Sequence, residues 1–356
     1  MQMTKEINDR KNTISCVGIL SKYFTQKLTT AYARDDRRMY AMPLSLNAAK
    51  LTRIEIVYHP LKDLILANVK AAQQKKSIYP PVVRFLRVIF PFLERFFPGL
   101  ARRLAIYLFL TPVHFPYKPA EEELLLTYQR FEGSYRGERF YYYAKGEGPA
   151  LICLHGWSGR GMQFRKMGEF FVNAGYRFVF IDAPGHGKSE GKRSNLFKFA
   201  AAFEEVLSHT PNVAAVVGHS LGAASISYSI SRGTQVPAFV VLGAPVIAED
   251  ILLTFSRTIN ASSFVHDAIR KAAVDVFDES FDDVAMQSTF REVKVPVISL
   301  HGARDTDVGL EHQDYLKRIN PGLTTIRYSD LGHRSILKDE RVFNDMKDWL
   351  EGLEQG

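Results

Sequence analysis

The sequence has 356 residues, of which 46% are hydrophobic and 24% charged, so it suits a globular protein with a sizeable core rather than a low-complexity chain. The net charge is +8, but no zinc-finger, helix-turn-helix or RNA-recognition pattern accompanies it, and we expect no nucleic-acid binding. The two cysteines, Cys16 and Cys153, lie far apart and exclude a disulfide framework and a CxxC metal site.

Residues 1–78 form an N-terminal extension of uncertain structure. They show no clear periodicity and contain charge clusters such as the run from Arg34 to Arg38. The first residues carry charges from Lys5 to Lys11 without a long apolar run behind them, so the sequence predicts no signal peptide. We therefore expect a cytoplasmic location, with membrane association left open by the segment that follows.

Residues 79–118 form a basic segment with two apolar stretches, 82–90 and 100–110, each containing arginines. The segment holds five arginines and one lysine against a single acid, Glu94. Neither stretch reaches the ~20 uncharged apolar residues that a membrane-spanning helix needs. Two interpretations remain open. One is a helix pair that packs on the core with its arginines in solvent, and the other is an amphipathic element in peripheral contact with an anionic membrane.

Three apolar, strand-like runs are each followed by a loop motif. Residues 150–154 precede His155-Gly156-Trp157, and residues 177–181 precede Asp182-Ala183-Pro184-Gly185-His186-Gly187-Lys188-Ser189. The third run, 212–217, precedes Gly218-His219-Ser220-Leu221-Gly222, after which residues 223–230 predict a helix. A strand that turns directly into a helix at Gly-x-Ser-x-Gly is a nucleophile elbow, which presents Ser220 above the sheet edge.

The order of these three motifs resembles the α/β-hydrolase family over about residues 123–353. The resemblance implies the α/β class: a mostly parallel central sheet with helices on both faces, in a hydrolase domain at 119–356. It also implies a short helical lid inserted at about 246–292.

The same resemblance supplies the partners of the serine. A strand at 295–300 leads into His301-Gly302-Ala303-Arg304-Asp305, which is similar to the family's acid-bearing segment. Asp305 is the matched acid, and Asp307 is the alternative. The last strand, 323–328, precedes a Gly-His pair whose His333 matches the family's base, ahead of a closing helix at 339–350. The implied triad is Ser220, Asp305 and His333.

An acyl-transfer site also needs donors for the oxyanion and a substrate pocket. The resemblance implies the backbone N–H groups of Leu221 and Trp157 as the donors. Candidate pocket residues are His219 beside the nucleophile and three apolar residues of the lid. These three are Leu252, Phe255 and Phe264, although apolar side chains of a lid more often form its own core.

No motif predicts a metal or a cofactor. The loop at 184–191 lacks the GxxxxGK[ST] spacing of a phosphate-binding loop, and no HExxH pattern occurs. We therefore predict a serine hydrolase that cleaves a small-molecule carboxylic ester, with a hydrophobic or lipid-like acyl group, through an acyl-enzyme. The alternatives are thioesterase, lyase or perhydrolase chemistry on the same triad, or a membrane-surface binding protein with little hydrolysis.

Overall fold

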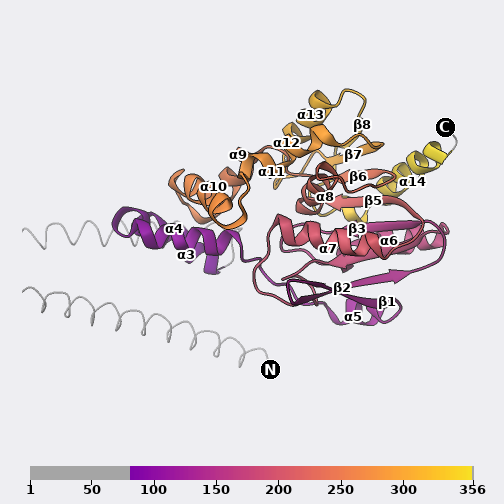
Figure 1. Ribbon diagram of the computed structural model, residues 1–356, viewed down its shortest axis with the longest axis horizontal. Coiled ribbons are helices and arrows are strands. Elements are labelled where there is room, and N and C mark those ends of the chain that lie inside the picture. Colours follow the sequence, from indigo (N-terminus) through magenta and orange to yellow (C-terminus); the bar gives the residue numbers. More distant parts are fainter. Residues whose placement is uncertain (1–80, 355–356) are drawn as a thin grey trace, which may run out of the picture. The chain divides into compact units, whose positions relative to one another are not determined.

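An eight-stranded sheet organises the described part of the protein (Figure 1). The computed structural model describes residues 81–354, so the N-terminal extension and Cys16 lie outside the described residues. The strands are β1 (Gln129–Tyr135), β2 (Glu138–Lys145), β3 (Ala150–Leu154), β4 (Arg177–Asp182), β5 (Val213–His219), β6 (Phe239–Leu242), β7 (Val297–Gly302) and β8 (Thr324–Tyr328). They lie in the order β1-β2-β4-β3-β5-β6-β7-β8.

Pairing is antiparallel for β1 with β2 and for β2 with β4, and parallel from β4 to β8. The central strands are mostly apolar and almost wholly buried, because both faces of a parallel sheet are covered. Alternate side chains of β3 enter different cores: Leu151 and Cys153 pack in one, Ile152 and Leu154 in the other. The mostly parallel sheet with helices on both faces is therefore confirmed.

Helices cover both faces of the sheet. On the face of Cys153 lie α5 (Pro119–Leu125), η1 (Gly161–Phe164), α6 (Arg165–Asn173), η3 (Ile336–Lys338) and α14 (Glu340–Glu354). On the other lie α7 (Leu196–Ser208), α8 (Leu221–Ser231), α12 (Met286–Thr289), η2 (Phe290–Glu292) and α13 (Leu310–Ile319). Burial raises the pKa of the Cys153 thiol well above its usual value, which favours an inert thiol.

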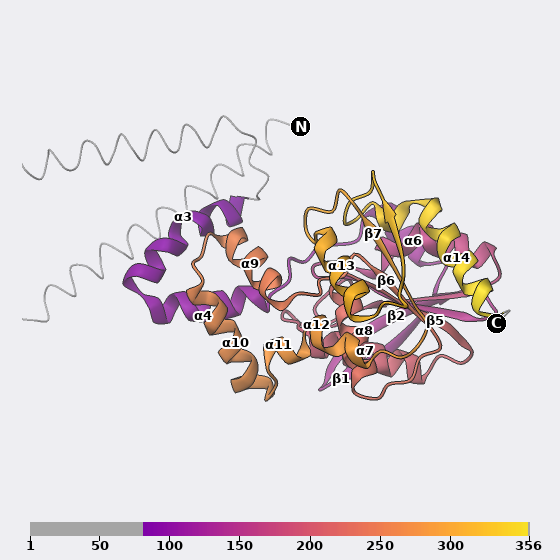
Figure 2. The ribbon, with the colours of Figure 1, turned by 90° about the horizontal axis from the view of Figure 1, so that it is seen from above.

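Five of the described helices remain, and all but α11 contribute to a separate apolar cluster. Two precede the sheet, α3 (Pro81–Phe96) and α4 (Pro98–Phe109), and three follow β6, α9 (Ala248–Ile259), α10 (Phe264–Phe277) and α11 (Phe281–Val284). Figures 1 and 2 show α3 and α4 beside α9 and α10. Phe90 of α3 and Val265 of α10 are fully buried in this cluster. We call α3, α4, α9 and α10 the cap cluster.

Helices α3 and α4 of the basic segment thus pack on the insertion between β6 and β7, whereas Tyr117 at the end of the segment lies in the core beside the sheet. Helix α3 runs through Pro91, and Pro91 itself is exposed. No helix within residues 81–354 is long and apolar enough to cross a membrane.

Candidate active site

Ser220 lies at the turn between β5 and α8 in a strained backbone conformation. Its φ of 53° and ψ of −124° are unusual for a residue other than glycine, and such strain typically costs ~1–3 kcal/mol. The Ser220 N–H donates to the Leu242 carbonyl of β6 at 3.0 Å, which anchors the turn to the neighbouring strand. The abrupt turn expected at this motif is therefore present.

The glycines around Ser220 are required by close backbone approach. A Cβ on Gly222 would lie 2.1 Å from the Leu154 carbonyl oxygen of β3, and one on Gly218 would lie 2.3 Å from the Ala223 Cα. Gly156, in the loop after β3, would place a Cβ 2.6 Å from the Ser220 Cβ. Because these positions carry no side chain, α8 and the β3 loop can both close on the serine.

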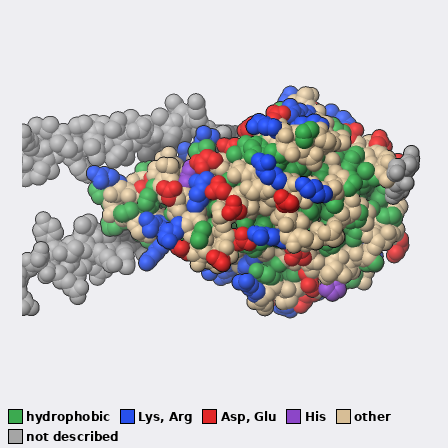
Figure 3. All heavy atoms as spheres, turned by 45° about the horizontal axis from the view of Figure 1, so that its top comes forward, with side chains coloured by type: hydrophobic (Ala, Val, Ile, Leu, Met, Phe, Trp, Pro, Cys, Tyr) green, Lys and Arg blue, Asp and Glu red, His purple; other side chains and the backbone are tan. Residues whose placement is uncertain are grey.

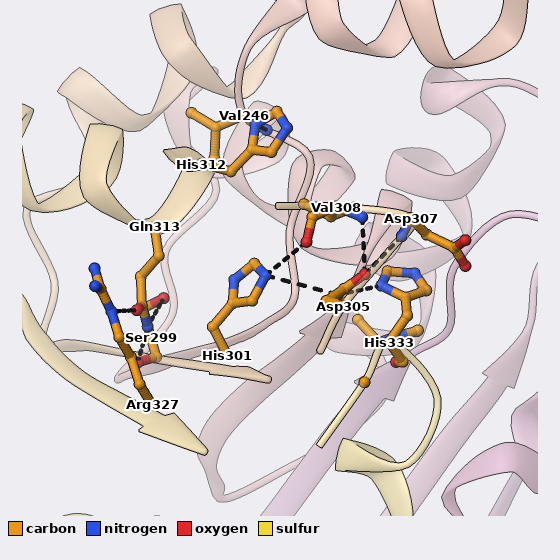
Figure 4. A network of polar contacts seen from close by, with 12 residues as sticks. Val246, Ser299, His301, Asp305, Asp307, Val308, His312, Gln313, Arg327 and His333 are labelled. Carbon is orange, nitrogen blue, oxygen red and sulfur yellow. Dashed lines mark hydrogen bonds and ion pairs between the residues drawn. The ribbon is translucent and has the colours of Figure 1, made fainter. Parts of the chain in front are cut away.

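Asp305 and His333 form a hydrogen-bonded pair at the ends of β7 and β8 (Figure 4). His333 Nδ1 lies 2.7 Å from Asp305 Oδ2, and the Asp305 side chain is only 2% exposed. The other carboxylate oxygen, Oδ1, accepts the N–H groups of Asp307 at 2.9 Å and Val308 at 2.8 Å. Burial alone would raise the pKa of Asp305, but the hydrogen bond and charge of His333 and these two donors hold it below the usual value.

Asp307, the alternative acid, is exposed and meets Asp305 only through its backbone N–H. The buried His301 also lies beside Asp305. Its Nε2 donates to the Val308 carbonyl at 2.9 Å and lies 3.6 Å from Asp305 Oδ2. Burial lowers the pKa of His301, so this imidazole is neutral near pH 7. The geometry thus favours Asp305 over Asp307 as the partner of His333.

His219 connects the nucleophile turn to His333. Its Nε2 donates to the His333 carbonyl at 2.8 Å, and the two ring centroids are 4.6 Å apart. Burial, together with the neighbouring His333, lowers the pKa of His219 to about 3, so the ring stays neutral. This contact places the backbone of His333 next to the residue that precedes Ser220.

Two buried histidines fix the loop that carries Trp157. The Ala183 N–H donates to His155 Nε2 at 3.2 Å, which leaves Nδ1–H to donate to the Gly156 carbonyl at 2.8 Å. The Ser158 N–H donates to His186 Nε2 at 3.1 Å, and burial lowers the pKa of His186 to about 4. The Trp157 backbone is therefore held directly after Gly156, whose backbone faces Ser220.

Leu221 is the first residue of α8, where an N–H has no acceptor within its own helix. The Trp157 indole meets the His186 ring edge-on, with centroids 5.4 Å apart. The role of the Leu221 and Trp157 backbone N–H groups as oxyanion donors stays a prediction.

Two features of the site were not anticipated from the sequence. Gly243, directly after β6, has a φ of 53°, and a Cβ there would lie 3.3 Å from Asp305 Oδ2 and 3.5 Å from His333 Nδ1. A glycine at the end of the strand at 238–242 was the only available signal. The second feature is a buried aspartate network beneath the loops.

Asp182 is fully buried and accepts four contacts within 3 Å. Tyr117 Oη donates to both carboxylate oxygens at 2.7 and 2.9 Å, and the N–H groups of Gly161 and Lys188 donate at 2.7 and 2.8 Å. Burial raises the pKa of Asp182, and burial and the adjacent carboxylate raise that of Tyr117 well above the usual range. Through Asp182, this network connects Tyr117 to the loop after β3 and the loop after β4.

Two of the three lid residues expected to line the pocket, Phe255 and Phe264, pack in the cap cluster. Leu252 is fully buried, the Phe255 ring meets Phe109 edge-on at 5.1 Å, and Phe264 lies under the Arg102 guanidinium at 5.4 Å. A groove of about 280 Å³ lies elsewhere, between the β1–β2 turn, α7, α8 and the end of α10. Neither Ser220 nor His333 lines it.

Asp250, Glu311 and His312 come close enough to suggest a metal site. However, His312 Nδ1 accepts the N–H groups of Val246 and Ile247, both at 3.1 Å, so its Nε2 carries the proton. A protonated Nε2 has no lone pair for a metal ion, and in His312 it faces the Asp250 carboxylate at 3.9 Å. The cluster of Asp250, Glu311 and His312 therefore does not fit a metal ion.

Comparisons with known proteins agree with this architecture. Residues 149–284 match the family described as alpha/beta hydrolase fold. The magnesium-chelatase 30 kDa subunit of Rhodobacter capsulatus is 38% identical over 104 residues, which is 28% of this chain and 35% of that protein. A pimeloyl-[acyl-carrier protein] methyl ester esterase of Chromobacterium violaceum is 28% identical over 163 residues, 45% of this chain and 58% of that protein.

The chain thus spans between about a third and three-fifths of the length of these two curated relatives. Among solved structures, an esterase from Pyrococcus furiosus superimposes with a TM-score of 0.52 at 20% identity, covering 68% of this chain and all of that one. This likeness extends the shared fold beyond the matched segment. The sheet, its motifs and the matched residues 149–284 together show an α/β-hydrolase fold.

Proposed function

We propose that the protein is a serine hydrolase that cleaves a small-molecule carboxylic ester. The observation that carries the proposal is the hydrogen bond between His219 and the His333 carbonyl. His219 directly precedes the strained Ser220, and His333 is paired with Asp305. In this family a serine, an acid and a histidine occupy these motif positions. Esterases among the relatives and solved structures support the ester class.

In the proposed mechanism Ser220 Oγ attacks the ester carbonyl while His333 accepts its proton. Asp305 fixes His333 with the proton on Nδ1, which leaves Nε2 free to act as the base. The N–H groups of Leu221 and Trp157 stabilise the oxyanion, and the alcohol leaves with the proton returned by His333. Water activated by His333 then hydrolyses the acyl-enzyme and regenerates Ser220.

Labelling with a fluorophosphonate probe tests the nucleophile. We expect the unaltered chain to be labelled and Ser220→Ala and His333→Ala to lose the label. Ser225→Ala is the matched control, since Ser225 is also buried in the first turns of α8 but its Oγ is bound to the Leu221 carbonyl. Labelling of Ser220→Ala at the native level would overturn the assignment.

The class of bond cleaved needs a second measurement. A panel of matched esters, thioesters, amides and peracids of hydrophobic acids should show hydrolysis of the esters and loss of that activity in Ser220→Ala. Faster thioester turnover, or perhydrolysis in preference to ester cleavage, would replace the ester assignment while keeping Ser220.

We also propose that the protein is cytoplasmic and that the acyl group of its substrate is hydrophobic or lipid-like.

A peripheral membrane contact through 79–118 would involve exposed residues of α3 and none of the residues of the proposed active site. It does not depend on whether Ser220 reacts.

A further inference from the structure

The exposed apolar side chains of the protein are concentrated in one short segment. Within residues 81–354, fourteen large hydrophobic side chains are exposed, and ten of them lie between Val82 and Phe115. Single exposed apolar residues are ordinary, but a contiguous group marks an interaction surface. Figure 3 shows hydrophobic and basic side chains, with acidic ones among them, on the described surface over the cap cluster.

Helix α3 has two apolar faces. One face, with Phe90 and Leu93 buried, packs in the cap cluster. The other carries Phe85, Val88, Phe92 and Phe96, whose spacing of three and four residues places them in one stripe along the helix. Their exposed fractions are 53%, 80%, 45% and 61%. We call these four residues the outer stripe.

The outer stripe is aromatic and continues onto the start of α4. The Phe92 and Phe96 rings are 4.7 Å apart, and the Phe92 and Phe97 rings 6.1 Å apart. A surface-lying helix in a membrane interface presents such bulky apolar side chains, flanked by cations.

Cations flank the stripe, and the single acid nearby is turned away. Arg84 and Arg95 of α3 are exposed, and the Arg95 guanidinium lies 6.0 Å from the centre of the Phe96 ring. The Glu94 carboxylate instead accepts the Ser262 N–H at 3.0 and 3.1 Å and the Ser262 hydroxyl at 3.0 Å. This face therefore presents positive charge around apolar side chains, which complements a negatively charged lipid surface.

We propose that the outer stripe of α3 docks on the surface of an anionic lipid bilayer, with the aromatic rings inserted among the headgroups and the arginines on lipid phosphates. The helix is fixed for this role because its inner side is clamped to the insertion. The Asn260 side-chain amide donates to the Arg87 carbonyl at 2.9 Å, and the Arg87 guanidinium donates to the Thr258 carbonyl at 3.1 Å.

Sedimentation of the full chain with vesicles tests the proposal. We expect binding to vesicles of phosphatidylcholine with phosphatidylglycerol, and much weaker binding to phosphatidylcholine alone. Arg84→Gln/Arg95→Gln should lower the partition coefficient ~30-fold, since each arginine near an anionic surface contributes about fivefold. Phe92→Ser/Phe96→Ser should lower it about tenfold or more.

The control variant is Val274→Ser/Val276→Ser, which removes two side chains 52% and 65% exposed on α10, outside the stripe. It should bind as the unaltered chain does, and so should Ser220→Ala, because docking does not depend on a reactive serine. Thermal denaturation verifies that each variant is folded. Native vesicle binding by Phe92→Ser/Phe96→Ser would overturn the proposal. A dimer in solution that this variant converts to monomer, without any vesicle binding, would also overturn it by assigning the stripe to a second copy.

Discussion

Replacing Asp305 with asparagine reverses the proton position on His333. The Asp305 Oδ1 accepts two backbone N–H groups, so the asparagine must keep its carbonyl oxygen there and direct its amide NH₂ at His333. Since the amide donates, His333 Nδ1 must become an acceptor and its proton moves to Nε2. A histidine protonated on Nε2 cannot accept the proton of Ser220.

The expected cost is large for turnover and small for folding. A tautomer reversal of this kind costs about 10⁴ in kcat in serine proteases, or ~5.5 kcal/mol of transition-state stabilisation. Folding exchanges the charge-assisted 2.7 Å hydrogen bond between Asp305 and His333 for a neutral one, at a cost of about 1 kcal/mol. For a domain of this size that is a fall of roughly 2–4 °C in Tm.

Initial rates on p-nitrophenyl butyrate, together with a melting curve, measure both effects. Asp307→Asn is the matched control, since its side chain is exposed, and its rate should stay within about a factor of two to three. If Asp305→Asn kept more than about a tenth of native kcat while Asp307→Asn lost activity, the acid would be Asp307 and the tautomer argument would be wrong.

The lowered pKa of Asp305 adds a pH dependence to the same comparison. A carboxyl with a depressed pKa stabilises the fold above its unfolded pKa and loses that contribution as pH falls through the folded value. The stability difference between native and Asp305→Asn should thus be constant near neutral pH and shrink below about pH 4. A difference that grew on acidification would contradict the assigned sign.

Three further substitutions test the framework of the site. Gly222→Ala should lower Tm by about 6–12 °C, because its methyl group meets the Leu154 carbonyl, whereas Gly99→Ala, with open space around it, should not lower Tm. Tyr117→Phe should reduce the free energy of unfolding in urea by about 2 kcal/mol, as Asp182 loses its side-chain donor; an unchanged value would deny the network a stabilising role. His219→Phe should lower kcat about tenfold with KM and Tm nearly unchanged, and His219→Gln, which retains a donor, should recover part of it. The kcat–pH profile of the native chain should show no step from His219 above about pH 4.

Much of the fold is predictable because local sequence and final environment agree. The apolar runs at 150–154 and 177–181 are strands buried on both faces, and each ends within one residue of its expected boundary. The glycines of the Ser220 motif are predictable for the same reason: the turn and the close approach to β3 leave no room for side chains.

The rest depends on contacts that no local pattern encodes. The periodicity of α3 does not indicate whether its apolar side packs on the sheet or on the insertion after β6. In the structure it packs on the insertion. Phe255 and Phe264 have the composition of pocket walls, yet they pack against α4 residues that lie far away in the sequence. Gly243 becomes meaningful only once β6 is known to lie beside β7.

The construction of the cap cluster has a consequence for synthesis on the ribosome. Arg87 and Arg257, which meet in this cluster, are 170 residues apart, so α3 and α4 emerge long before α9 and α10 exist. At ~5–20 residues per second, the inner apolar faces of the first two helices wait about 10–30 s for their partners. During that interval both sides of α3 are uncovered, and the nascent chain has a need for chaperone protection that the finished protein no longer has.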